Sequence, residues 1–249
     1  MANIVRCKTP AGILRFQPFS VSDYRDILLV RADMETKTDE EQRAMLDELL
    51  NDYFPDYPKA WHPFLFLSQY TSSIGKTKIP VQFECSKCGK KKQFLFNLAI
   101  DELKTPSIDV AGVRLDFNFP DEIKADLTAM ILDNIVSVTD SEKTYLWSEL
   151  DEKSKSAIID IIDYESLEQL VKQFRAFTIK VKYGCCTKHS VEYTDILDVF
   201  KILVNQDEIF IFYQVNHMLV KNNYNLESVM KMIPIERNIA LSLVEKDLK

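Results

Sequence analysis

The chain has 249 residues, of which 46% are hydrophobic and 28% are charged, and this composition is typical of an ordinary globular protein. The formal net charge of −7 argues against DNA or RNA as the main partner, because proteins that bind backbone phosphates usually carry the opposite sign. No apolar stretch is long enough for a signal peptide or for a membrane span of roughly 18 residues, so we expect a cytoplasmic protein without a membrane segment.

The N-terminal part of the chain predicts a hairpin followed by helices. Alternating apolar residues flank a Thr-Pro-Ala-Gly turn, which indicates a β-hairpin in residues 3–18. Ser20 or Ser22 can cap the next helix, and a second helix is expected to begin near Asp39 with acidic residues in its first turn. The aromatic-rich run from Tyr53 to Tyr70 predicts a third helix, which we expect to be buried.

The pattern changes to alternation at Lys76. Residues 77–85 and 91–98 show the period of two that is typical of strands, and they predict a second hairpin. A third hairpin is expected around the Ala111-Gly112 turn, where apolar residues again alternate on both sides.

Helical patterns return in the second half of the chain. Residues 120–135 predict one helix with Pro120 in its first turn, and residues 151–177 predict one or two amphipathic helices. Alternation reappears in residues 178–184, with 190–193 as the expected partner strand. The end of the chain is again helical.

These elements predict the α+β class, with helices predominating and short antiparallel β-hairpins inserted between them. No linker is visible, so we expect a single domain over residues 1–249. Within it, residues of about 76–98 and 177–194 are predicted to form a zinc-ribbon-like subdomain, and residues of about 195–249 a helical C-terminal region.

The zinc prediction rests on two cysteine clusters. Five cysteines are an odd number, and thiols stay reduced in the cytoplasm, so metal binding is the more natural interpretation of a cysteine pair than a disulfide. Cys85 and Cys88 are three residues apart with a glycine after the second, which is the form of a zinc knuckle. Cys186 and His189 have the same spacing, and Cys185 is the alternative ligand. Four such ligands close the coordination shell, which makes the predicted Zn²⁺ structural.

The alternative interpretation is that these cysteines are small buried hydrophobic residues, and we expect that role for the isolated Cys7. Other possible signals are weaker. Gly75-Lys76-Thr77 resembles the end of a phosphate-binding loop but lacks its first glycine. Neither His62 nor His217 has a nucleophile and an acid in a recognisable arrangement, so we predict no catalytic residues and no enzyme activity.

Two surface features leave alternatives open. Lysines between 87 and 92 make the tip of the second hairpin basic, which suits either a solvated turn or a contact with phosphates. Residues 196–220 contain more apolar side chains than one helix face can hold, so either the core or a partner protein covers them. Met218, Met230 and Met232 would suit an adaptable contact surface.

Several segments resemble the baseplate hub assembly proteins of T-even-type bacteriophages. They are Ala2 to Lys8, Ser73 to Lys78, Asp109 to Gly112 and Met230 to Arg237. The resemblance implies a tail assembly protein that promotes formation of the baseplate central hub through contacts with other hub or tail proteins. It would act in the host bacterial cytoplasm or in the virion baseplate. A permanent structural subunit of the baseplate, or a zinc-ribbon protein that binds nucleic acid, is the alternative.

Overall fold

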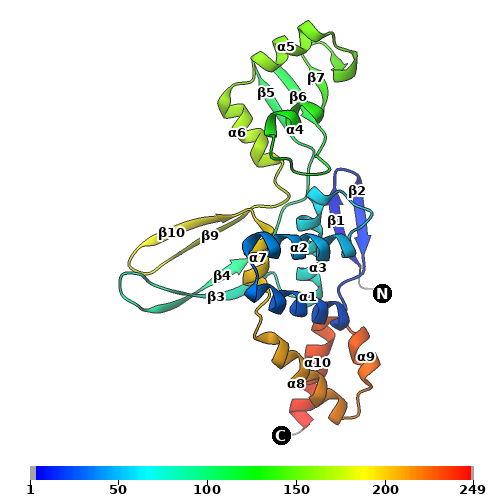
Figure 1. Ribbon diagram of the computed structural model, residues 1–249, viewed down its shortest axis with the longest axis vertical. Helices are drawn as coiled ribbons and strands as arrows, with labels where there is room; N and C mark the ends of the chain where they lie inside the picture. Colours follow the sequence, from blue (N-terminus) through cyan, green and yellow to red (C-terminus); the bar gives the residue numbers. More distant parts are fainter. Residues whose placement is uncertain (1–3, 248–249) are drawn as a thin grey trace.

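The computed structural model describes residues 4–247. Asn3, the first residue of the predicted N-terminal hairpin, lies outside this range, and so does Ala2, which with Asn3 begins the first of the segments that resemble the baseplate proteins. A central body of helices carries a pair of β-hairpins that project to one side (Figure 1). A small lobe of strands and helices lies at one end of the body, and the C-terminal helices lie at the other. The predicted α+β class with short antiparallel hairpins is confirmed.

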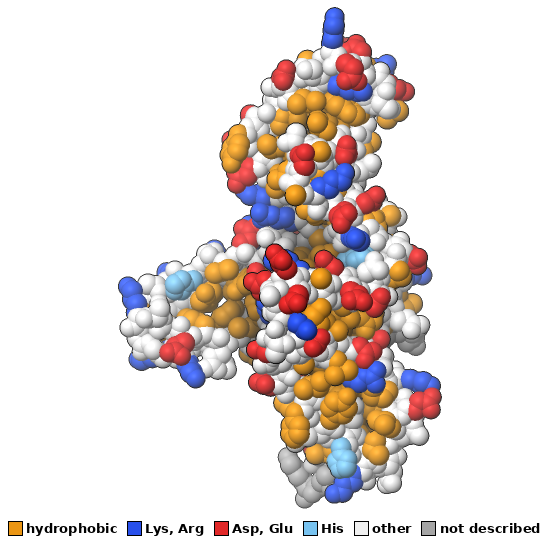
Figure 2. All heavy atoms as spheres, in the orientation of Figure 1, with side chains coloured by type: hydrophobic (Ala, Val, Ile, Leu, Met, Phe, Trp, Pro, Cys, Tyr) orange, Lys and Arg blue, Asp and Glu red, His pale blue; other side chains and the backbone are white. Residues whose placement is uncertain are grey.

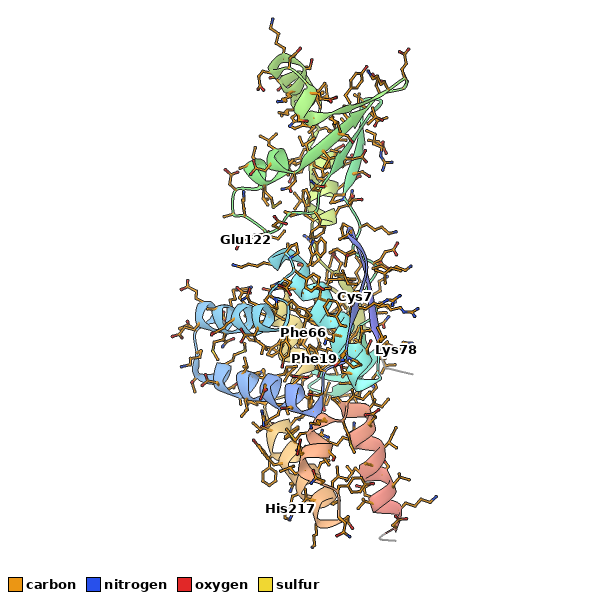
Figure 3. The ribbon with its side chains drawn as sticks, turned by 90° about the vertical axis from the view of Figure 1, so that its right-hand side faces the viewer. Cys7, Phe19, Phe66, Lys78, Glu122 and His217 are labelled. Atoms are coloured by element: carbon orange, nitrogen blue, oxygen red, sulfur yellow. The ribbon has the colours of Figure 1, made fainter. Side chains whose placement is uncertain are left out.

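The central body is formed by the N-terminal hairpin and four helices. They are β1 (Val5–Thr9), β2 (Gly12–Phe16), α1 (Val21–Asp33), α2 (Asp39–Tyr53), α3 (His62–Ile74) and α7 (Ile196–Leu203). A capping box at Ser20 fixes the start of α1, because the Ser20 hydroxyl accepts from the Asp23 N–H and the Asp23 carboxylate accepts from the Ser20 N–H. Phe19 and Phe66 lie in the core of the body, with ring centroids 5.8 Å apart (Figure 3).

The lobe at one end has its own hydrophobic core. Its elements are β5 (Ser107–Val110), β6 (Val113–Phe117), α4 (Leu127–Asp133), β7 (Ile135–Thr139), β8 (Thr144–Leu146), α5 (Glu152–Asp160) and α6 (Tyr164–Gln173). The strands form one antiparallel sheet in the order β5-β6-β7-β8. The buried residues Leu115, Phe117, Leu170 and Phe174 join this sheet to α6.

Two helix predictions differ from the structure. The single helix expected over residues 120–135 is wrong, because α4 begins only at Leu127 and Ile135 opens strand β7. Asp126 caps α4 by accepting from the Ala129 N–H, and the β-branched run after Asn134 pairs with β6. The buried helix expected from Tyr53 begins later, at His62, after a short 3₁₀ turn (Lys59–Trp61).

The projecting hairpins form what we call the arm, residues 78–97 and 179–193. The first hairpin pairs β3 (Lys78–Glu84) with β4 (Lys91–Asn97), and the second pairs β9 (Ile179–Gly184) with β10 (Lys188–Tyr193). They pack face to face through aromatic rings. Phe94 stacks on Tyr183 at a centroid distance of 4.9 Å, so the two predicted hairpins share a small core although about 80 residues separate them along the chain.

The C-terminal helices are α8 (Glu208–Lys221), α9 (Leu226–Lys231) and α10 (Pro234–Asp247). Their own buried core is small and consists of Leu219, Val229, Ala240 and Val244. They attach to the body through α1, where the Val21 N–H donates to the Met232 carbonyl at 2.7 Å. Buried residues thus fall into separate clusters in body, lobe and C-terminal helices, and the single-domain organisation stays a prediction. None of the helices that the structure describes is long and apolar enough to cross a membrane.

Candidate metal centre

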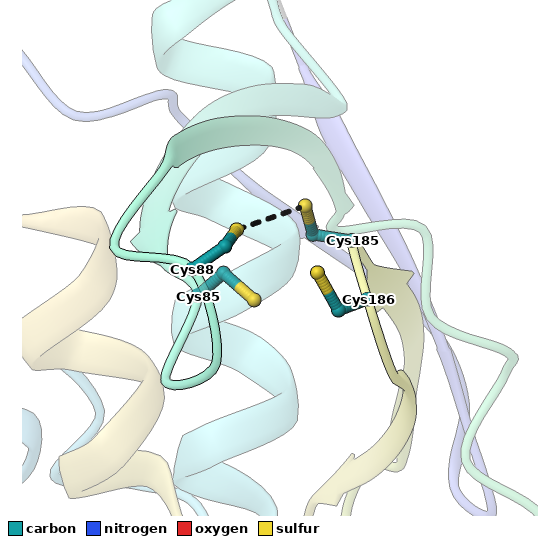
Figure 4. Close-up of side chains that lie close together, drawn as sticks. All are labelled: Cys85, Cys88, Cys185 and Cys186. Carbon is teal, nitrogen blue, oxygen red and sulfur yellow. Dashed lines mark hydrogen bonds between the residues drawn. The ribbon is translucent and has the colours of Figure 1, made fainter.

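Four thiols meet at the free end of the arm. The Sγ atoms of Cys85, Cys88, Cys185 and Cys186 all lie within 4.8 Å of one another. Figure 4 shows that one pair comes from each hairpin, and the Cys88 and Cys185 Sγ atoms are 3.7 Å apart. The cluster therefore joins two segments that lie about a hundred residues apart in the sequence.

Turn geometry positions the first pair of thiols. The Cys85 N–H donates to the Lys90 carbonyl at 3.0 Å, and the Gly89 N–H donates to the Cys85 carbonyl at 2.8 Å. Gly89 has a φ of 64°, a left-handed conformation that glycine adopts without steric cost. The turn therefore curls Cys85 and Cys88 toward the same side, as expected from their spacing.

The second pair sits in a tighter turn. Gly184 and Lys188 are the last paired residues of the second hairpin, and the Cys185 N–H donates to the Thr187 carbonyl at 3.1 Å. A Cβ atom at position 184 would collide with that same carbonyl, so the turn requires glycine there. Both cysteines consequently stand in the turn itself, facing the knuckle of the first hairpin.

The electrostatics of the cluster favour a cation at its centre. Backbone N–H groups of Cys186, Lys87 and Cys88 point at the Cys85 sulfur and lower its pKa to about 6. The neighbouring thiols, Cys88 first among them, raise the pKa of Cys186 to about 12 and also raise the pKa of Cys185. One thiolate therefore forms readily and the next ones do not, because the remaining thiols hydrogen-bond to neighbouring sulfurs and because a second negative charge would be repelled by the first. A divalent cation would remove that repulsion.

The spacing and chemistry of the sulfurs fit zinc. Tetrahedral Zn²⁺ with bonds of about 2.3 Å to each thiolate requires sulfur–sulfur distances of roughly 3.8 Å. The distance of 3.7 Å between Cys88 and Cys185 matches this value. Four thiolates leave no open position for water, so such a site is structural.

The structure brings the predicted ligands Cys85, Cys88 and Cys186 together, with Cys185, the alternative ligand, in the same group. His189 lies outside it. His189 is paired with Tyr183 across the two strands of the second hairpin, and its ring stacks on the Tyr183 ring. Its Nε2 atom is 2.9 Å from the Thr187 Oγ1. The expected partner strand of 190–193 starts too late. Strand β10 begins at Lys188, and this two-residue extension moves His189 from the turn into the strand.

The other candidate residues are not assembled into a site. Cys7 is buried, as predicted, and burial raises the pKa of its thiol. His62 is also buried, and its Nε2 lies 3.0 Å from the Tyr57 carbonyl, whereas His217 is exposed on α8 (Figure 3). Around Gly75 a helix ends and a strand follows, which is the reverse of the order in a phosphate-binding loop.

Comparison with known families identifies the chain. Residues 1–201 match the family described as T4 bacteriophage base plate protein. This match covers more than half of the sequence, so the chain belongs to the T4 bacteriophage base plate protein family, and the resemblance found in the sequence is confirmed. Residues 203–249 match the description "Baseplate hub assembly protein Gp51 C-terminal domain", so the boundary between the two matches falls at the end of α7. No curated protein and no solved structure matches the chain.

Proposed function

We propose that this protein promotes assembly of the baseplate central hub through contacts with other hub or tail proteins, and that it is not an enzyme. The family to which it belongs supports a role in the baseplate, and the match of its C-terminal helices supports a role at the hub. Its place of action is then the host cytoplasm, the virion baseplate or both. A permanent place in the virion would make it a structural subunit as well.

The observation that carries this proposal is the exposed apolar surface of α8. Only one side of this helix is buried, through Phe212, Asn216 and Leu219. Phe210 is 66% exposed and Tyr213 is 53% exposed on its other sides. Figure 2 shows hydrophobic side chains gathered over the C-terminal helices. A helix that is apolar on nearly all sides but buried on one is typical of a surface that a partner covers.

We further propose that Cys85, Cys88, Cys185 and Cys186 hold a structural Zn²⁺. When bound, the ion would cross-link the two hairpins and contribute to the folding energy of the arm. The ligand set with Cys186 and His189 is the alternative, and it would require His189 to leave its contact with Thr187. In either case the protein's own residues supply four ligands, so the site supports a role in folding and none in catalysis.

Substitution of the exposed aromatic residues tests the functional proposal. Phe210→Ser combined with Tyr213→Ser should prevent co-purification with baseplate hub proteins of the same phage and should reduce the yield of hubs in infected cells. Tyr164→Ser is the matched control, because Tyr164 is 82% exposed on α6 of the lobe and should be dispensable. Hub formation that survives the double substitution in a folded protein would contradict the proposal.

A further inference from the structure

The arm carries a charge opposite to that of the rest of the chain. Eight lysines and two glutamates lie in residues 78–97 and 179–193, which gives the arm a formal charge of +6 although the whole chain has −7. Four thiolates with one Zn²⁺ would contribute −2 and leave the arm at +4. Positive charge is thus concentrated on one projection of an otherwise acidic protein, and such a separation can steer a negatively charged partner toward the arm.

The arm lysines also lack partners within the molecule. Ion pairs elsewhere in the chain engage many of its other cations, such as Lys8 with Glu102 and Arg43 with Asp195. Within residues 4–247, no arm lysine has a carboxylate within ion-pair distance. These lysines are at positions 78, 87, 90, 91, 92, 180, 182 and 188, and all of them are exposed. Figure 2 shows basic side chains at the free end of the arm.

The aromatic residues of the arm face inward. Phe83 and Phe94 both contact the Tyr183 ring between the two hairpins, at centroid distances of 4.8 and 4.9 Å. They therefore offer no platform on which bases could stack, which single-stranded nucleic acid binders require. The outer face of the first hairpin instead carries Leu95, which is 62% exposed and pairs with Pro80. An exposed apolar residue among lysines suits a protein surface better than a phosphate backbone.

We propose that the arm is a second contact surface, which docks its lysines and Leu95 onto an acidic surface of a partner protein. This surface is distinct from α8, so the inference stands apart from the apolar contact proposed for hub assembly. The inward-facing aromatic rings and the exposed Leu95 make an acidic protein, and not a nucleic acid, the favoured occupant.

Binding of simple polyanions tests this inference. The probes are a fluorescent poly-L-glutamate of about 20 residues and a single-stranded DNA of about 20 nucleotides, compared by anisotropy at low and high salt. We expect the wild-type protein to bind polyglutamate at least as tightly as DNA. Lys90→Gln, Lys91→Gln and Lys182→Gln together should weaken binding of polyglutamate about tenfold, because each exposed ion pair contributes about a factor of two.

A control variant removes the same number of charges outside the arm. Lys37→Gln, Lys153→Gln and Lys246→Gln change exposed lysines without ion pairs in the described structure, and this triple variant should bind polyglutamate as the wild type does. Circular dichroism and metal content verify that both variants fold. Equal weakening by both variants, or tighter binding of DNA than of polyglutamate, would overturn the inference. A salt-sensitive dimer that the arm variant abolishes would assign the arm to a second copy of the chain and would also overturn it.

Discussion

The Sγ atoms of Cys88 and Cys185 lie 3.7 Å apart, although 97 positions separate these residues in the sequence. Each stands in the turn of a two-stranded hairpin, and an isolated hairpin of this kind is only marginally stable in water. The small aromatic core between the hairpins holds them together, and the Zn²⁺ proposed at their free end would add a second link. The contact between these two sulfurs is therefore the point at which loss of a ligand should have the largest structural effect.

Removal of one thiol should release the metal and loosen the arm. We expect Cys88→Ser or Cys185→Ser to abolish zinc binding and to lower the midpoint of thermal unfolding, because zinc binding energy on the order of 10 kcal/mol contributes to folding. Hydrogen exchange should become faster in residues 179–193. Cys7→Ala is the control: it leaves the cluster intact, so its zinc content should stay at that of the wild type. A Cys185→Ser protein that retains zinc would contradict the four-thiol set.

Substitution of His189 distinguishes the two ligand sets. The structure places this side chain against Thr187 and Tyr183, outside the thiol group, so His189→Ala should keep zinc with little change in affinity. Competition with a chromogenic chelator measures that affinity directly. A loss of affinity of about a hundredfold or more would show instead that the imidazole is a ligand.

The stability of the body should depend on pH through His62. Burial lowers the pKa of this imidazole below its usual 6.5, so the unfolded chain takes up a proton at a higher pH than the folded chain does. The contribution of neutral His62 to the free energy of unfolding is then fully present above about pH 6.5. It is lost as the pH falls below that value toward the lower pKa of the folded state. Urea unfolding in a metal-free Cys85→Ser background, where metal release contributes nothing, measures this slope. His62→Gln should flatten it, and an unchanged slope would contradict the assignment.

The attachment of the C-terminal helices should depend on the volume of Arg237 more than on its charge. The guanidinium is buried over the Phe212 ring at 4.7 Å, and its contact with the Asn216 Oδ1 is long, at 3.4 Å. No carboxylate of the described structure forms an ion pair with it. Arg237→Ala should lower the free energy of unfolding by about 2–4 kcal/mol through the cavity it leaves.

Arg237→Met is the companion variant, because it fills most of the same space without a buried charge. It should change the free energy of unfolding by less than about 1 kcal/mol or should stabilise the protein. Denaturant unfolding measures both variants under the same conditions. If the methionine variant is as unstable as the alanine variant, the charge of Arg237, and not its volume, anchors the C-terminal helices.

The hairpins could be predicted from the sequence because their signals are local. Alternating residues and the glycine turns at Gly89 and Gly184 fix both hairpins of the arm. Strand β7 was not predictable in this way, because Ile135 continues the helical spacing of Leu127 and Ile131 and only its pairing with β6 makes it a strand. Tertiary contacts decide such cases.

For the candidate site, too, the local signal in the sequence was sufficient for one part and insufficient for the other. The spacing of Cys85 and Cys88 indicates a knuckle, and the sequence offers three residues for the other ligands: Cys185, Cys186 and His189. The choice among them depends on where the second turn ends. That position follows from the register of β9 against β10, in which His189 faces Tyr183, and no local pattern encodes it.

Metal analysis of the purified protein tests the central claim most directly. The protein should be prepared under reducing conditions without chelators, and its zinc should be measured by mass spectrometry against the protein concentration. A single four-thiolate site that joins the two hairpins predicts about one zinc per chain. Less than about 0.2 zinc per chain, in a protein whose arm is nevertheless ordered, would contradict the claim that a metal holds the arm together.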